Sequence, residues 1–188
     1  MTAIVSLELF STTDSWHVDR ERSSIGFRVR QRMIESVWGR FLDFDGRIEP
    51  GQPPRIVGCI RVASLATDHP QRDEQLRSVA FFDAERYPVM GFASTKIALA
   101  EGGSLVVAGD LTIRGITRPI VLEGEFRGTF VDLDGRQRLG FGLRGAVNRL
   151  DFDLSLNRPP RGDSTIVGND TELLLDIVAA RTELERAA

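Results

Sequence analysis

Histidine and cysteine side chains are the usual sources of metal ligands and nucleophiles, and this chain of 188 residues has very few of them. Neither of its two histidines, His17 and His69, has another histidine or a cysteine close by in sequence. A metal site of the usual kinds needs several such ligands at fixed spacing, so we expect no bound metal. Cys59 is the single cysteine, which excludes an internal disulfide. Its apolar surroundings (IVGCIRV) indicate a buried small side chain rather than a nucleophile.

Carboxylates are the second group that could do chemistry. Asp68, Asp73 and Asp83 belong to one polar stretch and could act as general acid or base toward a substrate bound nearby. The same stretch contains Arg72 and Arg86, which favour ion pairs and turn contacts that hold it in place. We interpret these charges as structural and keep catalysis by the three aspartates as the alternative.

Two common enzyme motifs do not occur in a usable context. The chain has no Gly-x-Ser-x-Gly elbow, although a triad assembled from distant residues stays open. The run from Gly109 to Gly115 falls in an expected hairpin, whereas a phosphate-binding glycine loop joins a strand to a helix. We therefore predict no catalytic residue and no cofactor.

The polar stretch itself, TDHPQRDEQLRSVAFFDAERYP over residues 67–88, does not alternate as a strand would. Pro70 suits the first turn of a helix, and Asp68 is a plausible N-cap. Good helix formers follow, and the stretch then reaches the adjacent Phe81 and Phe82. A short polar helix of this kind predicts a lid or plug over a sheet.

The rest of the chain shows the two-residue alternation of β-strands. One expected strand, from Ile34 to Ile48, slips in its alternation between Phe41 and Phe44, which indicates a bulge or a strand that is apolar on both faces. The other expected strands are 16–30, 55–65, 89–99, 105–113, 120–126, 139–147 and 173–177. About eight or nine strands at hairpin spacing predict an all-β antiparallel sheet, most economically closed into a barrel because closure removes exposed edges. A β-sandwich is the alternative.

Composition narrows the function further. A net charge of −3 argues against a nucleic-acid-binding protein, and no apolar run is long enough for an integral membrane segment. The first residues lack the basic region of a secretory signal, so we expect a cytoplasmic location. We expect an N-terminal arm over residues 1–13, one domain over 14–180 and a charged tail over 181–188.

Phenylalanines suggest what the barrel could hold. A packed core explains any single one, but a barrel of about eight strands can also enclose one small ligand. Gly109, Gly140 and Gly142 are expected to leave room inside. An apolar space would suit a long hydrocarbon chain, because each buried methylene contributes about 0.8 kcal/mol.

Five segments together resemble one known family. They are WHVDRERSSIGFRVR, VWGRFLDFDGRI, ASLATDHPQRDEQLRSVAFFDAERYPVMGFASTKI, GDLTIRGITRPIVL and NRLDFDL. In the third, Arg72-Asp73, Leu76, Phe81-Phe82-Asp83 and Tyr87-Pro88 have the order and spacing of the YceI-like family of polyisoprenoid-binding, lipocalin-like proteins. The resemblance runs from about Trp16 to Ile177. One difference is Arg30-Gln31, where the family often has Lys-His.

The resemblance implies an extended antiparallel eight-stranded barrel around an elongated apolar pocket. It also implies binding of a polyisoprenoid or other long-chain lipid, such as a prenylquinone, without catalysis or metal, and homodimers would be unsurprising. By alternation, the pocket residues are predicted to be Phe27, Val29, Phe41, Leu111, Ile113, Leu122, Phe126 and Phe141, with Phe81 and Phe82 capping them. A hydrolase or isomerase acting in the same pocket and an interaction module with a filled barrel are the alternatives.

Overall fold

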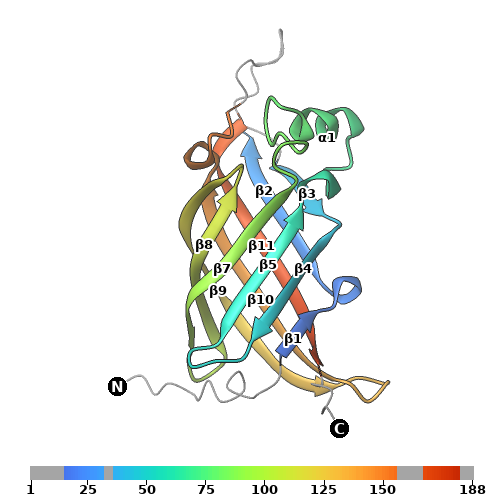
Figure 1. The fold of residues 1–188 in the computed structure, drawn as a ribbon, viewed down its shortest axis with the longest axis vertical. Coiled ribbons are helices and arrows are strands. Elements are labelled where there is room, and N and C mark those ends of the chain that lie inside the picture. Colours follow the sequence, from blue (N-terminus) through green and yellow to red (C-terminus); the bar gives the residue numbers. More distant parts are fainter. Residues whose placement is uncertain (1–14, 32–35, 156–166, 183–188) are drawn as a thin grey trace.

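The computed structural model shows β-strands wrapped around an apolar interior, with one short helix at one end (Figure 1). The structure describes residues 15–31, 36–155 and 167–182. The predicted N-terminal arm and all but the first two residues of the predicted tail lie outside these ranges. Those first two residues, Arg181 and Thr182, belong to the last strand.

The elements follow the predicted hairpin spacing. The strands are β1 Ser15–Val18, β2 Ser24–Gln31, β3 Ser36–Phe41, β4 Phe44–Glu49, β5 Arg55–Arg61, β6 Leu65–Ala66, β7 Val89–Leu99, β8 Ser104–Ile113, β9 Ile116–Val131, β10 Gln137–Asn148 and β11 Val167–Thr182. The helices are α1 Pro70–Arg77 and the 3₁₀ turns η2 Arg20–Arg22, η3 Val62–Ser64 and η4 Arg149–Phe152. β8 shows why these segments form strands: Leu105, Val107, Gly109, Leu111 and Ile113 are buried, and the residues that alternate with them are more exposed.

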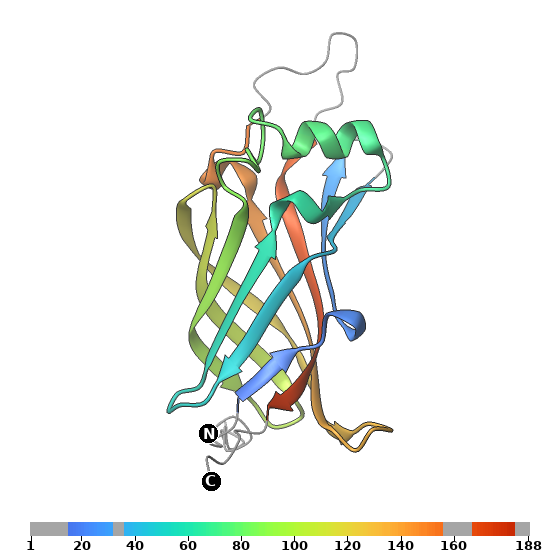
Figure 2. The same ribbon diagram turned by 45° about the vertical axis from the view of Figure 1, so that its right-hand side comes forward.

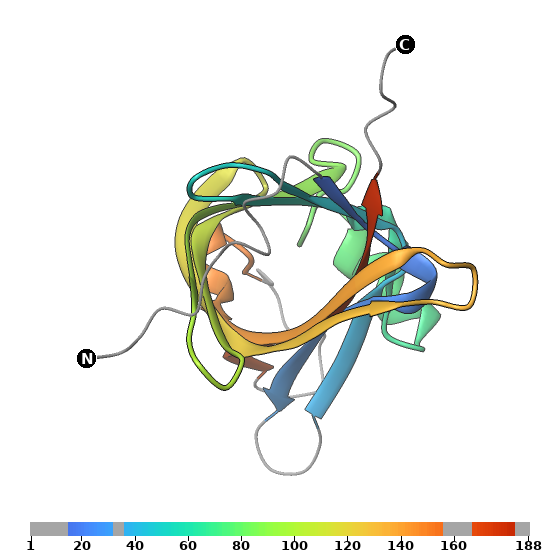
Figure 3. The same cartoon turned by 90° about the horizontal axis from the view of Figure 1, so that it is seen from below.

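The strands close into a ring. Neighbours pair in the order β1-β4-β5-β7-β8-β9-β10-β11, and β11 returns to β1 with Trp16 opposite Arg181. β2, β3 and β6 continue the walls of β1, β4 and β5 toward the helical end (Figure 2). The view along the barrel shows the wall surrounding the interior (Figure 3). The predicted closed eight-stranded antiparallel barrel is confirmed, and the sandwich alternative is wrong.

The prediction of one strand from Ile34 to Ile48 is wrong, because a bend at residues 42–43 separates β3 from β4. Residues 32–35 lie outside the described ranges. The bend lets Phe41 and Phe44 both be buried, which explains the slip in alternation. Asp43 fixes the bend: its carbonyl accepts from the Arg61 amide at 2.9 Å, and its carboxylate pairs with Arg20 at 2.6 Å. The expected strands 16–30 and 55–65 are likewise interrupted, by η2 and η3.

Helix α1 begins after His69, so the prediction of Asp68 as its N-cap is wrong. The His69 Nδ1 atom accepts a hydrogen bond from the Arg72 amide at 3.3 Å. Asp68 has a φ of 59°, and its carboxylate lies 3.1 Å from the Arg40 guanidinium. The aspartate therefore contacts β3, and the histidine next to it takes the capping position.

Polar contacts attach α1 to the barrel, because Asp73 is its single buried residue. The Asp73 carboxylate accepts from the amide of Thr67 at 2.9 Å and from its hydroxyl at 2.5 Å. Arg72 donates to the Thr67 hydroxyl at 2.7 Å and to its carbonyl at 2.8 Å. The predicted structural role of Arg72 and Asp73 thus has a specific partner, Thr67, at the end of β6.

Replacing Asp73 with alanine should destabilise the fold by about 2 kcal/mol, because the buried Thr67 amide and hydroxyl lose their acceptor. Glu74→Ala, at the exposed next position of the same helix, is the control and should change stability by less than about 0.5 kcal/mol. Urea unfolding of both variants measures the difference. Equal midpoints would show that Asp73 does not anchor α1.

The interior contains two clusters of buried side chains. The upper cluster lies beneath α1 and consists of Phe27, Phe41, Val62, Leu65, Phe81, Phe82, Met90, Leu111, Ile113, Phe152 and Leu154. The lower cluster lies at the opposite end and consists of Trp16, Ile48, Ile97, Leu99, Leu105, Val107, Leu122, Leu139, Phe141, Leu143, Ile177 and Ala179. Ile25, Phe92, Ile120 and Leu173 pack against both clusters, and we call these four residues the waist.

Candidate functional site

All ten predicted pocket residues pack in the interior, but they do not form one group. The upper cluster includes Phe27, Phe41, Phe81, Phe82, Leu111 and Ile113, and Val29 packs against it. The lower cluster includes Leu122 and Phe141, and Phe126 packs against it. Phe81 and Phe82 meet edge to face with their ring centroids 4.9 Å apart. Both are buried directly after α1, where the capping residues were predicted.

The waist connects the two groups, and the predicted pocket set omitted it. Its residues come from four strands: Ile25 from β2, Phe92 from β7, Ile120 from β9 and Leu173 from β11. Alternation alone indicates that Ile25 and Ile120 share faces with Phe27 and Leu122. What alternation cannot show is that all four residues pack between the two clusters. That depends on the register between strands, for example Ile120 opposite Gly109 and Leu173 opposite Phe27.

Exposure differs among the interior side chains. The lower residues are 0–5% exposed, and five of the eleven upper residues are equally buried, but the six predicted residues of the upper cluster are 7–9% exposed. The four waist residues are only partly buried. Accessible surface among the inward-facing side chains is therefore found at these six residues and at the waist.

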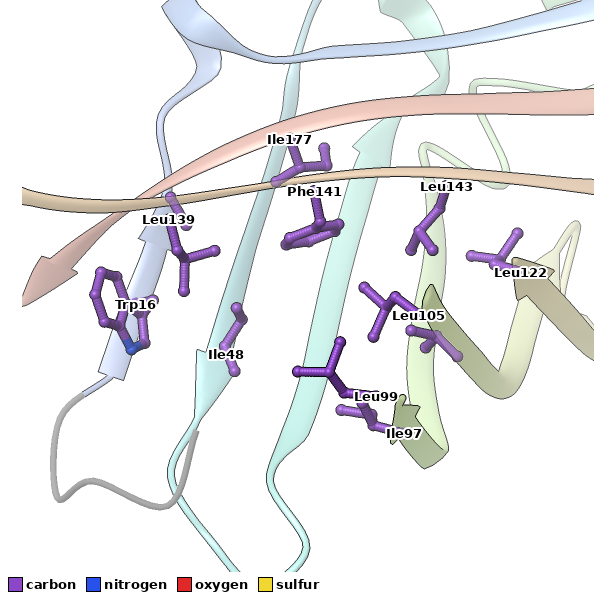
Figure 4. Packing of buried hydrophobic residues seen from close by; sticks show 12 residues of the cluster. Trp16, Ile48, Ile97, Leu99, Leu105, Leu122, Leu139, Phe141, Leu143 and Ile177 are labelled. Carbon is purple, nitrogen blue, oxygen red and sulfur yellow. The ribbon is translucent and has the colours of Figure 1, made fainter. Parts of the chain in front are cut away.

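Across the lower cluster, Leu139, Phe141 and Leu143 of β10 point toward side chains of the opposite wall (Figure 4). This contact seals the lower end. One polar atom is enclosed there: the indole nitrogen of Trp16 is buried with no hydrogen-bond acceptor among the described residues.

The expectation that three strand glycines leave room inside is wrong. A Cβ on Gly109 would lie 2.5 Å from the Phe92 ring, so the aromatic side chain already covers this glycine. Gly140 and Gly142 alternate with buried Leu139 and Phe141, and their outer side is covered by Arg127. Phe27 covers Gly39 in the way that Phe92 covers Gly109. Rings thus occupy the inward spaces that glycine leaves.

Gly109→Ala should destabilise the barrel by about 1–3 kcal/mol, because the new methyl group would clash with both the Phe92 ring and the Ala93 carbonyl. Gly91→Ala is the matched control on β7, since its Cβ would meet no atom within 4 Å. Thermal unfolding of both variants tests the prediction. A Gly109→Ala protein as stable as Gly91→Ala would contradict it.

The three candidate acid–base aspartates do not form a constellation. Asp73 is occupied by Thr67, and Asp68 is exposed and paired with Arg40. Asp83 is partly buried in the turn that follows Phe82, where its amide donates to the Ser78 carbonyl at 2.8 Å. Within residues 15–31, 36–155 and 167–182, no group of three or more histidine, cysteine, aspartate or glutamate side chains is placed to hold a metal ion. Helices among these residues are too short or too polar to cross a membrane.

The most buried charged residue, Arg138, lies at the lower rim, away from the upper cluster. Arg138 is 3% exposed and donates to Asp19 and to Asp132, each at 2.5 Å. Burial raises the pKa of Asp19, but the hydrogen bond and positive charge of Arg138 outweigh this effect, and the pKa falls below its ordinary value. Hydrogen bonds from Arg138 and from the backbone amides of Arg136 and Asp134 lower the pKa of Asp132. The three side chains tie the β9–β10 hairpin to the segment after β1.

The outer wall also carries a groove of about 800 Å³ across β9, β10, β11, β2 and β3. Its walls include charged pairs, such as Arg127 with Glu125 and Asp176. The exposed Trp38 also lines the groove, and the Arg28 guanidinium stacks 5.1 Å from its ring centre. This groove is open and contains charged side chains, and none of the predicted pocket residues lines it.

Comparison with known proteins gives one consistent match. The YceI-like domain family matches residues 16–179. An UPF0312 protein of Photorhabdus laumondii is 34% identical over 86% of this chain and 82% of its own length. Protein YceI of Escherichia coli O157:H7 is 31% identical over 77% of this chain and 78% of its own length.

Solved structures agree. The YceI protein of Campylobacter jejuni has a TM-score of 0.69 at 28% identity, covering 82% of this chain and 90% of its own. A polyisoprenoid binding domain from Saccharophagus degradans has a TM-score of 0.66 at 14% identity, covering 89% and 98%, and at that identity it supports the fold alone. The family match and the barrel together show that this chain belongs to the YceI-like domain family.

Proposed function

We propose that this protein binds a polyisoprenoid or other long-chain amphiphile, such as a prenylquinone, inside its barrel without catalysing a reaction on it. The observation that carries the proposal is the continuous apolar interior, in which the waist joins the upper and lower clusters. Membership of the YceI-like domain family, for which the resemblance in sequence implies polyisoprenoid binding, supports the ligand class. The contacts of Asp68 and Asp73 with neighbouring residues support a non-catalytic role.

The proposed ligand lies in the upper half of the barrel and at the waist, where inward-facing side chains keep accessible surface. Its chain contacts the upper members of the predicted pocket, and Phe81 and Phe82 close the space beneath α1. The lower cluster forms the floor. The distance from α1 to the lower cluster therefore limits how much of the ligand's hydrocarbon chain the barrel can enclose. Ligands of different chain lengths measure this limit.

A filled barrel that serves as an interaction module is the second candidate. It is favoured by the phenylalanine rings that cover Gly39 and Gly109. In a binding protein these rings would line the ligand, whereas in a filled barrel they would complete the core. The two candidates differ in whether added lipid stabilises the protein.

Native mass spectrometry of the purified protein, with organic extraction of bound material, tests the proposal. A bound species of prenyl-chain mass is the expected result, and the same spectra test whether the protein forms a homodimer. Prenylquinones of increasing chain length should bind more tightly until the space is full, with a gain in binding free energy of about 0.8 kcal/mol per buried methylene. The melting temperature should rise with chain length for the same reason. A protein that is empty and unaffected by every chain length would favour the filled barrel.

A further inference from the structure

The β9–β10 hairpin ends in an exposed apolar tip, which consists of Phe130, Val131 and Leu133. Their exposed fractions are 48%, 63% and 107%. Phe130 and Val131 are neighbours on one strand, so they point to opposite faces of the hairpin, and Leu133 stands in the turn. The hairpin extends past the barrel wall at the end opposite α1 (Figures 2 and 3).

The turn that presents this tip is held in one conformation. The Asp132 carboxylate accepts from the amides of Asp134 and Arg136, at 3.0 and 2.8 Å. The Asp132 amide donates to the Arg136 carbonyl at 3.0 Å, and Gly135 has a φ of 76°. Through Arg138, the same carboxylate is tied to Asp19 on the barrel. Leu133 is therefore displayed on a rigid support.

Shape and charge indicate what this tip contacts. A stable protein interface covers roughly 800 Å² on each partner, much more than three side chains at a convex tip offer. A protein partner would also cover one face of the hairpin, whereas apolar side chains here lie on both faces and at the end. A lipid layer, into which the tip can insert, would surround all three apolar side chains at once. Asp132 in the turn is paired with Arg138. The other two charged residues of the turn, Asp134 and Arg136, have opposite charges that cancel, which suits zwitterionic headgroups.

We propose that the tip inserts into a phospholipid surface and tethers the barrel there, with α1 and the upper cluster facing away from the surface. The inference goes beyond the proposed function, because the tip lies at the end opposite α1 and the upper cluster. The insertion is shallow, with Leu133 below the headgroups and the charged side chains of the turn among them.

Flotation of the full chain with phosphatidylcholine vesicles tests the tether. The protein is expected to float with the vesicles, and Leu133→Asp should lower the bound fraction by about tenfold or more, since a charge replaces the inserted side chain. Leu42→Asp is the matched control, because Leu42 is also an exposed leucine but lies at the bend between β3 and β4. It should float like the unchanged protein. Binding should persist in about 0.5 M salt, where surface electrostatics are screened.

Three results would overturn the tether: no flotation of the unchanged protein, an equal loss in both variants, or loss in salt. A dimer that Leu133→Asp converts to monomer, without flotation, would identify the tip as an interface between copies and also overturn it. Binding of a detergent-dispersed prenylquinone to the unchanged protein separates the two proposals. In the unchanged protein, normal quinone binding without flotation rejects the tether alone, and flotation without quinone binding rejects the carrier function alone.

Discussion

Replacing Arg138 with methionine should destabilise the protein by about 2–3 kcal/mol, because Asp19 and Asp132 lose the charged hydrogen bonds that the buried arginine donates. Of the two ion pairs, the one between Arg138 and Asp19 joins segments more than a hundred residues apart in sequence. Their loss therefore frees the β9–β10 hairpin from the segment after β1. Chemical denaturation, read by circular dichroism, measures the change.

Arg127→Met is the matched control, since Arg127 also contacts two carboxylates, Glu125 and Asp176. Its side chain is 46% exposed, and pairs of this kind are worth less than about 1 kcal/mol each. Equal destabilisation by the two substitutions would show that burial does not set the strength of the Arg138 contacts. Asp19→Asn and Asp132→Asn, added to Arg138→Met, should restore part of the stability.

The stability difference between the unchanged protein and Arg138→Met should depend on pH in one direction. The pKa values of Asp19 and Asp132 are lowered in the folded state, so the unfolded chain binds more protons between the folded and unfolded values. The contribution of the two aspartates to the free energy of unfolding is fully present above the unfolded pKa of about 4. It is lost as the pH falls through the lower pKa values of the folded state. The two proteins should therefore converge in stability in acid.

A tryptophan in place of Ile120 should weaken the binding of long-chain ligands, because the proposed ligand reaches the waist. Ile120 points inward opposite Gly109, close to the Phe92 ring that covers this glycine. An indole at this position would divide the interior. Losing contact with about four methylenes costs about 3 kcal/mol, which corresponds to roughly a hundredfold weaker binding.

Val121→Trp is the control, because Val121 is the next residue on β9 and is exposed on the outer wall. It should bind every chain length like the unchanged protein. Ile120→Trp should retain a short prenylquinone that fits above the waist, and circular dichroism checks that both variants are folded. Unchanged long-chain affinity in Ile120→Trp would place the ligand outside the waist, while loss of the short ligand as well would indicate a distorted barrel.

Alternation in the sequence determined the faces of the strands. Leu111, Ile113, Leu122 and Phe141 were assigned inward because the side-chain period of a strand is two, and the structure buries all four. The polar composition of residues 70–77 likewise predicted a helix with little to bury, and α1 has this character. These features are local, so the order of residues is enough to determine them.

Only the tertiary structure decided which inward residues meet. Register places Ile25, Phe92, Ile120 and Leu173 between the two clusters, although they come from four strands. Within β7, a register shift between Ser94 and Lys96 lets Phe92 and Ile97 both face inward, which strict alternation forbids. The ring over Gly109, the contact of Asp68 with Arg40 and the burial of Arg138 also depend on distant segments. Contacts between distant segments arise when the barrel closes, and no local pattern encodes them.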